Sequence, residues 1–485
     1  MNRRSFLKVT GSGFAGLAFG SSLLSCGTTQ PSKPNIVLIM ADDLGWNELG
    51  CYGQDKIRTP NIDRLAEQGL TFSQFYAGSA VCAPSRCNLM TGMHAGHAYV
   101  RSNKEIPNPE PGIFGGQVPL PAETKTIAEV LKDQGYATGC FGKWGLGAVD
   151  TPGDPLNQGF DRFYGYNGQR HAHNLYPRYL VSDKENVFLD GNSRGLTGEQ
   201  YAPQLIADQM LQWADEQATE PFFLYYPTVI PHLPLQVPDE YLEEYEGLWD
   251  ETPYTGERYQ PHPTPRAAYA AMITFMDAQV GRLLKLLQEK GLEENTIVMF
   301  TSDNGATLLN DQVDVEFFNS VGPLRGLKGS LHEGGIRVPL VARWPGKIDP
   351  GSSSDHISAH YDMPATLADM AGTSMEESTD GISMVSALTS RSDQQQVHDY
   401  LFWDFSGYGG QLAVRMGQWK GIKKGLQQNP DAPLELYNLE EDIAEQNNVV
   451  DDYPGIAEQI ERIMLEARTV PEVEEFRFGR YGEST

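Results

Sequence analysis

Residues 82–92 bring together a cysteine, a proline and an arginine at a spacing that suits an anion-binding helix start. Pro84 fits the first turn of a helix, where its missing N–H costs nothing. Ser85 and Arg86 add donors beside the exposed backbone N–H groups of that turn, which attract anions. Cys82 lies just upstream, directed at any anion bound there. The Cys–Pro–Arg triplet alone is equally compatible with an ordinary loop-to-helix junction and a buried cysteine.

Oxygen ligands for a metal ion recur at two places far apart in the chain. Each acidic pair follows an apolar run of strand length: Asp42 and Asp43 follow Asn35–Met40, and Asp303 and Asn304 follow Thr296–Thr301. The carboxyl ends of strands in an open α/β sheet form its ligand-binding edge, so the pairs are predicted to meet there. An all-oxygen ligand set points to Ca²⁺ or Mg²⁺. Either pair alone would be interpreted as a turn or a helix cap.

Basic residues and a histidine follow two further apolar runs. Lys143 follows Tyr136–Phe141, and His232 follows Pro221–Tyr226. Lys328 lies later, in a glycine-rich stretch. The formal net charge is −27, so a nucleic-acid partner is not expected, and an anionic ligand needs positive charge gathered locally.

The elements that must position these residues alternate between short apolar runs and amphipathic helices. This pattern predicts an α/β fold with a large, mostly parallel sheet sandwiched by helices over residues 35–390. The expected helices include Thr126–Gln134 and Ala267–Lys290, and a further strand is expected at Val338–Ala342. Residues 106–123 and 248–265 are rich in proline and are predicted to be long loops that shape a cleft.

From about Gln394 the pattern changes to short strands separated by turns. Residues 391–485 are therefore predicted to form a small subdomain of antiparallel strands plus one helix. The expected strands and helix are Tyr400–Phe405, Gln411–Met416, Trp419–Lys424, Leu434–Leu439 and, for the helix, Tyr453–Ala467.

The first 26 residues are predicted to be a targeting segment. Arg3 and Arg4 resemble a twin-arginine export signal, and Leu23–Gly27 resembles a lipoprotein cleavage box with Cys26 as the acylated residue. A plain export signal is the alternative. Residues 27–34 are then a tether. The expected location is periplasmic or in the cell envelope, with membrane contact only through a lipid anchor on Cys26.

Taken in order, these motifs resemble the type I sulfatases of the alkaline-phosphatase-like superfamily, including bacterial polysaccharide sulfatases and arylsulfatases. The resemblance covers nearly the whole mature chain. It runs through the Ala-Asp-Asp-Leu-Gly start, the Cys82 run with Leu-x-Thr-Gly, Gly142-Lys143-Trp144, Pro231-His232, Ser302-Asp303-Asn304-Gly305 and Lys328…Glu333-Gly334-Gly335.

The resemblance implies that Cys82 is oxidised to formylglycine (3-oxoalanine) by a maturation enzyme, and that the hydrated aldehyde attacks sulfur. It further implies a catalytic set of Cys82, Arg86, Lys143, His173, His232 and Lys328, and Ca²⁺ held by Asp42, Asp43, Asp303, Asn304 and the modified Cys82. Arg86, Lys143 and Lys328 would bind sulfate, and His232 would act on the leaving-group oxygen.

One position departs from the family pattern. Many sulfatases have Lys-Trp-His where this chain has Lys143-Trp144-Gly145, and that histidine helps to expel sulfate. His173, in the run Gln169–Pro177, is the candidate to replace it, with a substrate contact as the alternative role. His171 and Arg101 complete the residues expected to bind substrate, together with Lys143, Lys328 and His173.

The function expected from the resemblance is hydrolysis of sulfate esters, on a carbohydrate. A galactose-type ring is weakly favoured, and residues 403–415 and the loop of His171 and His173 are expected to set specificity. Two alternatives remain: a metal-dependent phosphatase of the same superfamily, and a lipid-anchored glycan-binding protein whose site has decayed.

Overall fold

A ten-stranded sheet forms the centre of the computed structural model, which describes residues 33–375 and 379–482. Four strands at its middle are parallel neighbours, and they follow from the continuous apolar runs that the sequence places there. In spatial order they are β11 (Thr296–Ser302), β1 (Asn35–Ala41), β10 (Phe222–Pro227) and β6 (Ala137–Lys143).

The flanks of the sheet add antiparallel strands to this parallel centre. β12 (Leu340–Arg343), the strand expected at Val338–Ala342, runs antiparallel to β11. The remaining strands are β2 (Leu70–Phe72) and β13 (Ser352–Ser354) on that side, and β7 (Arg162–Tyr166), β8 (Tyr179–Ser182) and β9 (Glu185–Phe188) on the other. β7 continues the parallel order beside β6, whereas β8 and β9 are joined as antiparallel hairpin strands.

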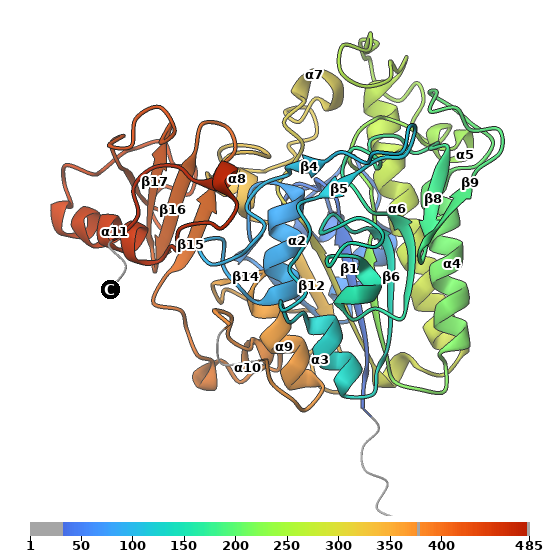
Figure 1. Cartoon of the computed structure of the whole chain (residues 1–485), viewed down its shortest axis with the longest axis horizontal. Helices are drawn as coiled ribbons and strands as arrows, with labels where there is room; N and C mark the ends of the chain where they lie inside the picture. The colour runs from blue at the N-terminus through green and yellow to red at the C-terminus, as the bar shows by residue number, and fades with distance from the viewer. Residues whose placement is uncertain (1–32, 376–378, 483–485) are drawn as a thin grey trace, which may run out of the picture. The chain divides into compact units, whose positions relative to one another are not determined.

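Helices cover both faces of the sheet, as predicted. Side chains alternate along β1, so Val37 and Ile39 pack into one core while Ile36 and Leu38 pack into the other. The first core is covered by α1 (Pro60–Glu67), α4 (Ala202–Glu216) and α6 (Pro265–Glu289). The second is covered by α2 (Cys82–Thr91), α3 (Ile127–Asp133), α9 (Asp362–Met370) and α10 (Val385–Leu388), of which Figure 1 shows α2, α3 and α9 together on one side of the sheet.

The C-terminal strands form the separate antiparallel sheet that the sequence predicts. Its order is β15 (Leu401–Phe405), β16 (Gln411–Met416), β17 (Trp419–Lys424) and β18 (Glu435–Asn438). Helix α11 (Pro454–Glu466) packs against it through buried Ile460 and Met464. The short elements are β3 (Phe75–Tyr76) paired with β14 (Ser358–Ala359), β4 (Glu105–Ile106) paired with β5 (Gly116–Gln117), α5 (Asp239–Leu242), α7 (Asn310–Val313) and α8 (Glu333–Ile336).

The predicted export signal, the tether up to Ser32 and the acylated Cys26 lie outside the described residues. Within the described residues, no helix combines the length and the apolar character needed to cross a bilayer.

Candidate active site

The four central strands bring their chemically active residues to one edge of the sheet. Register pairs Ala41 of β1 with Ser302 of β11, so Asp42 and Asp303 leave the sheet at the same level. Lys143 is the last residue of β6, and His232 follows β10 in the next loop. Segments that are up to about 260 positions apart in the sequence therefore meet because their strands are neighbours, as the strand-end argument predicts.

Cys82 is the first residue of α2 and faces this edge. Its Sγ lies 3.4 Å from Oδ1 of Asp42 and 3.3 Å from Nζ of Lys328. Burial and the nearby Asp303 charge raise the pKa of the Cys82 thiol, so the unmodified side chain is a neutral and weak nucleophile. The N–H of Ala83 in the same turn donates to Oδ1 of Asn103 at 2.8 Å, a contact that the sequence did not predict.

Each carboxylate at the edge is paired with a buried cation. Lys143 Nζ lies 2.6 Å from Asp42, and Arg86 donates to Asp303 at 2.8 Å. Lys328 Nζ lies 2.6 Å from Asp43. Burial by itself would raise the pKa of Asp43, but the positive charge of Lys328 is the main cause that outweighs it, and the pKa is lowered. The basic residues are thus where an anion would need them.

The oxygen-rich set fits a hard divalent cation. Asp42 and Asp43 offer carboxylate oxygens together with Cys82 and His232, and the ligand atoms of these four residues lie within 4.8 Å of one another. Asn304 Nδ2 donates to Asp43 at 2.8 Å, while its Oδ1 is buried with no hydrogen-bond partner among the described residues. An unsatisfied buried oxygen beside carboxylates is the donor that Ca²⁺ or Mg²⁺ would take.

His232 and His173 lie face to face beside this set. Their ring centroids are 4.8 Å apart and the rings are nearly parallel at 17°, with Tyr259 edge-on to His173. His232 Nδ1 contacts the Leu233 carbonyl at 2.7 Å, which assigns the proton to Nδ1 and turns Nε2 towards Asp43, 3.7 Å away. Burial lowers the pKa of His232 to about 3 and that of His173 well below its usual value.

The position where many sulfatases carry a histidine is filled from another loop. Gly145 has a φ of +83°, and a Cβ built there would lie 2.3 Å from Nε2 of Gln169. The Gln169 side chain is buried, and neither end of its amide has a hydrogen-bond partner within the part of the chain that is described. Gln169 therefore occupies the space beside Gly145, while His173, the candidate to replace the missing histidine, lies against His232 and lines the cavity.

The structure does not bring His171 or Arg101 to the cavity. His171 is 2% exposed, its Nε2–H donates to the Tyr179 carbonyl at 2.9 Å, and its ring stacks on Phe114. Arg101 is also 2% exposed and donates to Asp404 at 3.1 Å and to the Thr469 carbonyl. Both side chains are buried and form their hydrogen bonds with neighbouring protein groups, so they do not face the cavity.

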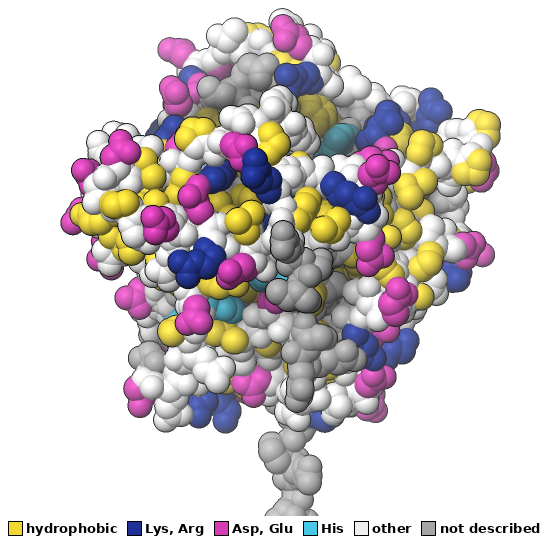
Figure 2. Space-filling model, turned by 60° about the vertical axis from the view of Figure 1, so that its left-hand side comes forward, with side chains coloured by type: hydrophobic (Ala, Val, Ile, Leu, Met, Phe, Trp, Pro, Cys, Tyr) yellow, Lys and Arg dark blue, Asp and Glu magenta, His cyan; other side chains and the backbone are white. Residues whose placement is uncertain are grey.

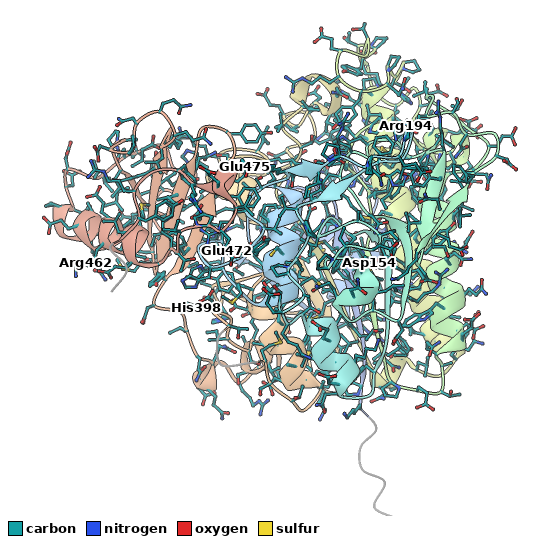
Figure 3. All side chains as sticks on the ribbon, viewed as in Figure 1. Asp154, Arg194, His398, Arg462, Glu472 and Glu475 are labelled. Carbon is teal, nitrogen blue, oxygen red and sulfur yellow. The ribbon has the colours of Figure 1, made fainter. Side chains whose placement is uncertain are left out.

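A cavity of about 820 Å³ opens over Cys82. Asp43, His173, His232 and Lys328 also line it, as predicted site residues. Other lining residues were not named individually as site residues: Asn103, Phe114, Gln169, Arg170, Arg194, Arg258, Tyr259 and Tyr408. Phe114, Arg258 and Tyr259 lie in the proline-rich loops that were expected to shape a cleft, and Gln169, Arg170 and Tyr408 lie in the two segments that were expected to set specificity. Arg194, labelled in Figure 3 near the upper end of the main sheet, had no such signal.

Comparison with known proteins matches this geometry to one family. The sulfatase family model covers residues 34–373, and the model described as N-sulphoglucosamine sulphohydrolase, C-terminal, covers residues 327–469. Arylsulfatase A of Homo sapiens is 33% identical over 419 residues, which are 82% of this chain and 76% of that protein. N-acetylgalactosamine-6-O-sulfatase of Bacteroides thetaiotaomicron is 28% identical, covering 90% of this chain and 93% of that protein.

A solved structure shows the same architecture. The crystal structure of Ps i-CgsB in complex with k-i-k-neocarrahexaose superposes with a TM-score of 0.75 at 28% identity, covering 94% of this chain and 96% of that one. Sequence motifs, strand-end geometry and these relatives agree. The chain belongs to the sulfatase family and is a type I sulfatase, a sulfuric ester hydrolase.

Proposed function

We propose that this protein hydrolyses sulfate esters on a sulfated carbohydrate, using a formylglycine made from Cys82 and a Ca²⁺ ion. The observation that supports this best is the place of Cys82, buried at the start of α2 between Asp42 and Lys328. A thiol with a raised pKa is a poor nucleophile, so oxidation to an aldehyde would give this position a chemical role that the thiol lacks.

The residues that would hold the cation are Asp42, Asp43, Asp303, Asn304 and the modified Cys82. When bound, the hydrated aldehyde and the cation would supply an oxygen nucleophile of lowered pKa. Lys143 and Lys328 now pair with the carboxylates that would face the cation. A cation in the site would compete for those carboxylates and leave both ammonium groups for sulfate oxygens.

Arg86, Lys143 and Lys328 would then position the sulfate and neutralise its charge. All three side chains are at least nine-tenths buried, so their interactions with an anion are little screened by water. Arg86 is also bound to the Lys143 carbonyl, which couples the position of its guanidinium to the end of β6.

His232 would handle the leaving-group oxygen. Its Nδ1–H is engaged by the Leu233 carbonyl, so Nε2 is the nitrogen that can exchange a proton with substrate. Burial keeps the ring neutral in the free site, with a pKa of about 3. An arriving sulfate brings negative charge beside the ring and raises that pKa, which prepares His232 to donate a proton as the ester bond breaks.

The carbohydrate part of the proposal rests on the cavity and on the relatives. Tyr259, Phe114 and Tyr408 line it among polar side chains, a mixture suited to sugar rings. N-acetylgalactosamine-6-O-sulfatase and the complex of Ps i-CgsB with k-i-k-neocarrahexaose both involve sugars.

The test uses protein co-produced with a formylglycine-generating enzyme. Mass spectrometry of the Cys82 peptide should show the aldehyde, and p-nitrophenyl sulfate should be hydrolysed far faster than p-nitrophenyl phosphate. Removal of divalent ions should abolish turnover, and Ca²⁺ should restore it. Preferred phosphate hydrolysis would favour the phosphatase alternative, and no turnover by aldehyde-containing protein would favour the decayed glycan-binding protein.

A further inference from the structure

The cavity over Cys82 carries positive charge in addition to that of Lys328. Arg170, Arg194 and Arg258 line it, whereas Asp43 is the only acidic residue among the described lining residues, and it is already paired with Lys328. Acidic and basic side chains are interspersed over the face shown in Figure 2, and the whole chain carries a net charge of −27. Three arginines gathered in one cavity of such a protein are a local feature that attracts anions.

The three arginines differ in how they are held. Arg170 is exposed and lies 3.6 Å from Glu105, and Arg258 is exposed to solvent. Arg194 is half-buried, and its Nη1 is buried with no hydrogen-bond partner among the described residues. No carboxylate in that part of the chain forms an ion pair with it. Removing part of a cationic side chain from water without a hydrogen-bond partner costs free energy. A bound anion would offset that cost.

The backbone of Arg194 is fixed on both sides. Its N–H donates to the Tyr176 carbonyl at 3.2 Å, and its own carbonyl accepts from Gln260 at 3.1 Å and from Asn174 at 3.3 Å. These bonds hold the backbone of Arg194 at a φ of 65°, a conformation that residues other than glycine rarely adopt. The hydrogen bonds therefore fix the direction in which the Arg194 side chain leaves the backbone.

The guanidinium is also placed by an aromatic stack. It lies over the ring of Phe114, 4.6 Å from the centroid, and the same ring stacks on His171 with the ring centroids 5.4 Å apart. The buried His171 thus positions Phe114, and Phe114 supports Arg194. Burial is the main cause that lowers the pKa of Arg194, and the like charges of Arg178 and Arg170 add to it.

We propose that Arg194 binds a second anionic group of the substrate, a sulfate ester or a carboxylate on the sugar next to the one that is cut. This inference rests on the proposed function, because the second anion is defined relative to the sulfate bound at Cys82. It assigns the substrate class: the preferred carbohydrate carries at least two anions. Arg is suited to this role because its planar fork binds sulfate and carboxylate oxygens in pairs.

The test compares three galactose disaccharides as inhibitors of p-nitrophenyl sulfate turnover by the matured enzyme. One carries a single sulfate, one a second sulfate and one a uronate carboxylate beside the sulfated sugar. A second anion should lower the inhibition constant by about tenfold, as expected for one charge-assisted contact. The two doubly anionic ligands distinguish sulfate from carboxylate as the preferred group.

Variants assign that gain to Arg194. The ratio of the inhibition constants should fall to near one in Arg194→Met and to an intermediate value in Arg194→Lys. It should be unchanged in Arg462→Met, which removes an exposed arginine on α11, labelled in Figure 3. No gain in the wild-type enzyme, or a gain that survives Arg194→Met, would overturn the inference.

Two further measurements keep the result separate from folding and from turnover. In the wild-type enzyme the gain should shrink as salt rises from about 0.05 to about 0.5 M, because salt screens a partly exposed charge contact. Calorimetric binding of the same ligands needs no turnover. An enzyme that fails to hydrolyse p-nitrophenyl sulfate contradicts the proposed function, whereas equal calorimetric affinities contradict the role of Arg194.

Discussion

The two ends of the cavity are built from different kinds of chain. At the inner end, Asp42, Lys143 and Asp303 are fully buried and follow or end parallel strands. At the outer end, Arg194 belongs to a loop and is held by hydrogen bonds from Gln260 and Asn174 and to the Tyr176 carbonyl. Because strand register fixes the inner end, its geometry changes little with loop sequence. Changes in loop sequence can therefore alter which substrate binds without moving the reacting groups.

Cys82→Ala is expected to have the largest effect on turnover, because it removes the side chain that would become the nucleophile. In protein from a maturing host, kcat for p-nitrophenyl sulfate should fall at least about 10⁴-fold, the order seen when a covalent nucleophile is lost. Cys51→Ala is the matched control, a free, half-buried cysteine that is not among the described residues lining the cavity and whose backbone N–H donates to Asp63. Activity of Cys82→Ala within tenfold of wild type would contradict the formylglycine mechanism.

His232→Ala should come next, with an effect that depends on the leaving group. General acid catalysis contributes about 10²–10⁴-fold, so turnover of a sugar sulfate should fall by that order. p-Nitrophenyl sulfate should lose much less, because nitrophenolate leaves without a proton. An equal loss on both substrates would instead assign His232 to sulfate binding.

The sequence predicted the inner end better than the outer one, for a physical reason. Cys82, Lys143 and Asp303 each adjoin an element whose apolar pattern is visible in the chain, and parallel strands bring their carboxyl ends together. The partners of Gly145 and Arg194 are set by how loops pack on one another, which leaves no periodic signal. The antiparallel direction of β12 escaped prediction similarly, since a buried run looks alike in either direction.

Gly145 lies beside Gln169, a residue of the cavity lining, and a substitution there tests how firmly Gln169 is held. Gly145→Ala should lower the free energy of unfolding by about 2 kcal/mol, because an L side chain is strained at positive φ and its Cβ would meet Gln169. Gly135→Ala is the control: Gly135 has a φ of +82° with nothing within 4 Å, so it measures the backbone strain alone. Urea unfolding should show a smaller cost for Gly135→Ala; equal costs would mean that Gln169 moves away freely.

His173→Ala should lower kcat by about tenfold, chiefly by releasing His232. The stacked ring restrains His232 and excludes water beside it, so His173 is expected to act as a positioning residue. His173→Phe keeps an aromatic ring and should recover most of kcat on a sugar sulfate. A loss of several orders of magnitude that phenylalanine fails to rescue would restore the original hypothesis that His173 replaces the missing histidine. A change confined to KM would make it a substrate contact.

The smallest expected effect is on the stability of the fold at acid pH and concerns His171, whose ring stacks on Phe114. Burial lowers the pKa of His171 from 6.5 to about 3. Between these two pH values the unfolded chain therefore binds a proton at this histidine that the folded chain does not bind. Stability is therefore lost as pH falls from 6.5 towards 3, and one such group accounts for about 1 kcal/mol between pH 7 and 5.5. His171→Phe keeps a ring against Phe114 and removes the titration. Urea unfolding should show a fall in stability between those pH values smaller by that amount than in wild type, and an unchanged fall would mean that the buried ring is protonated within the folded protein.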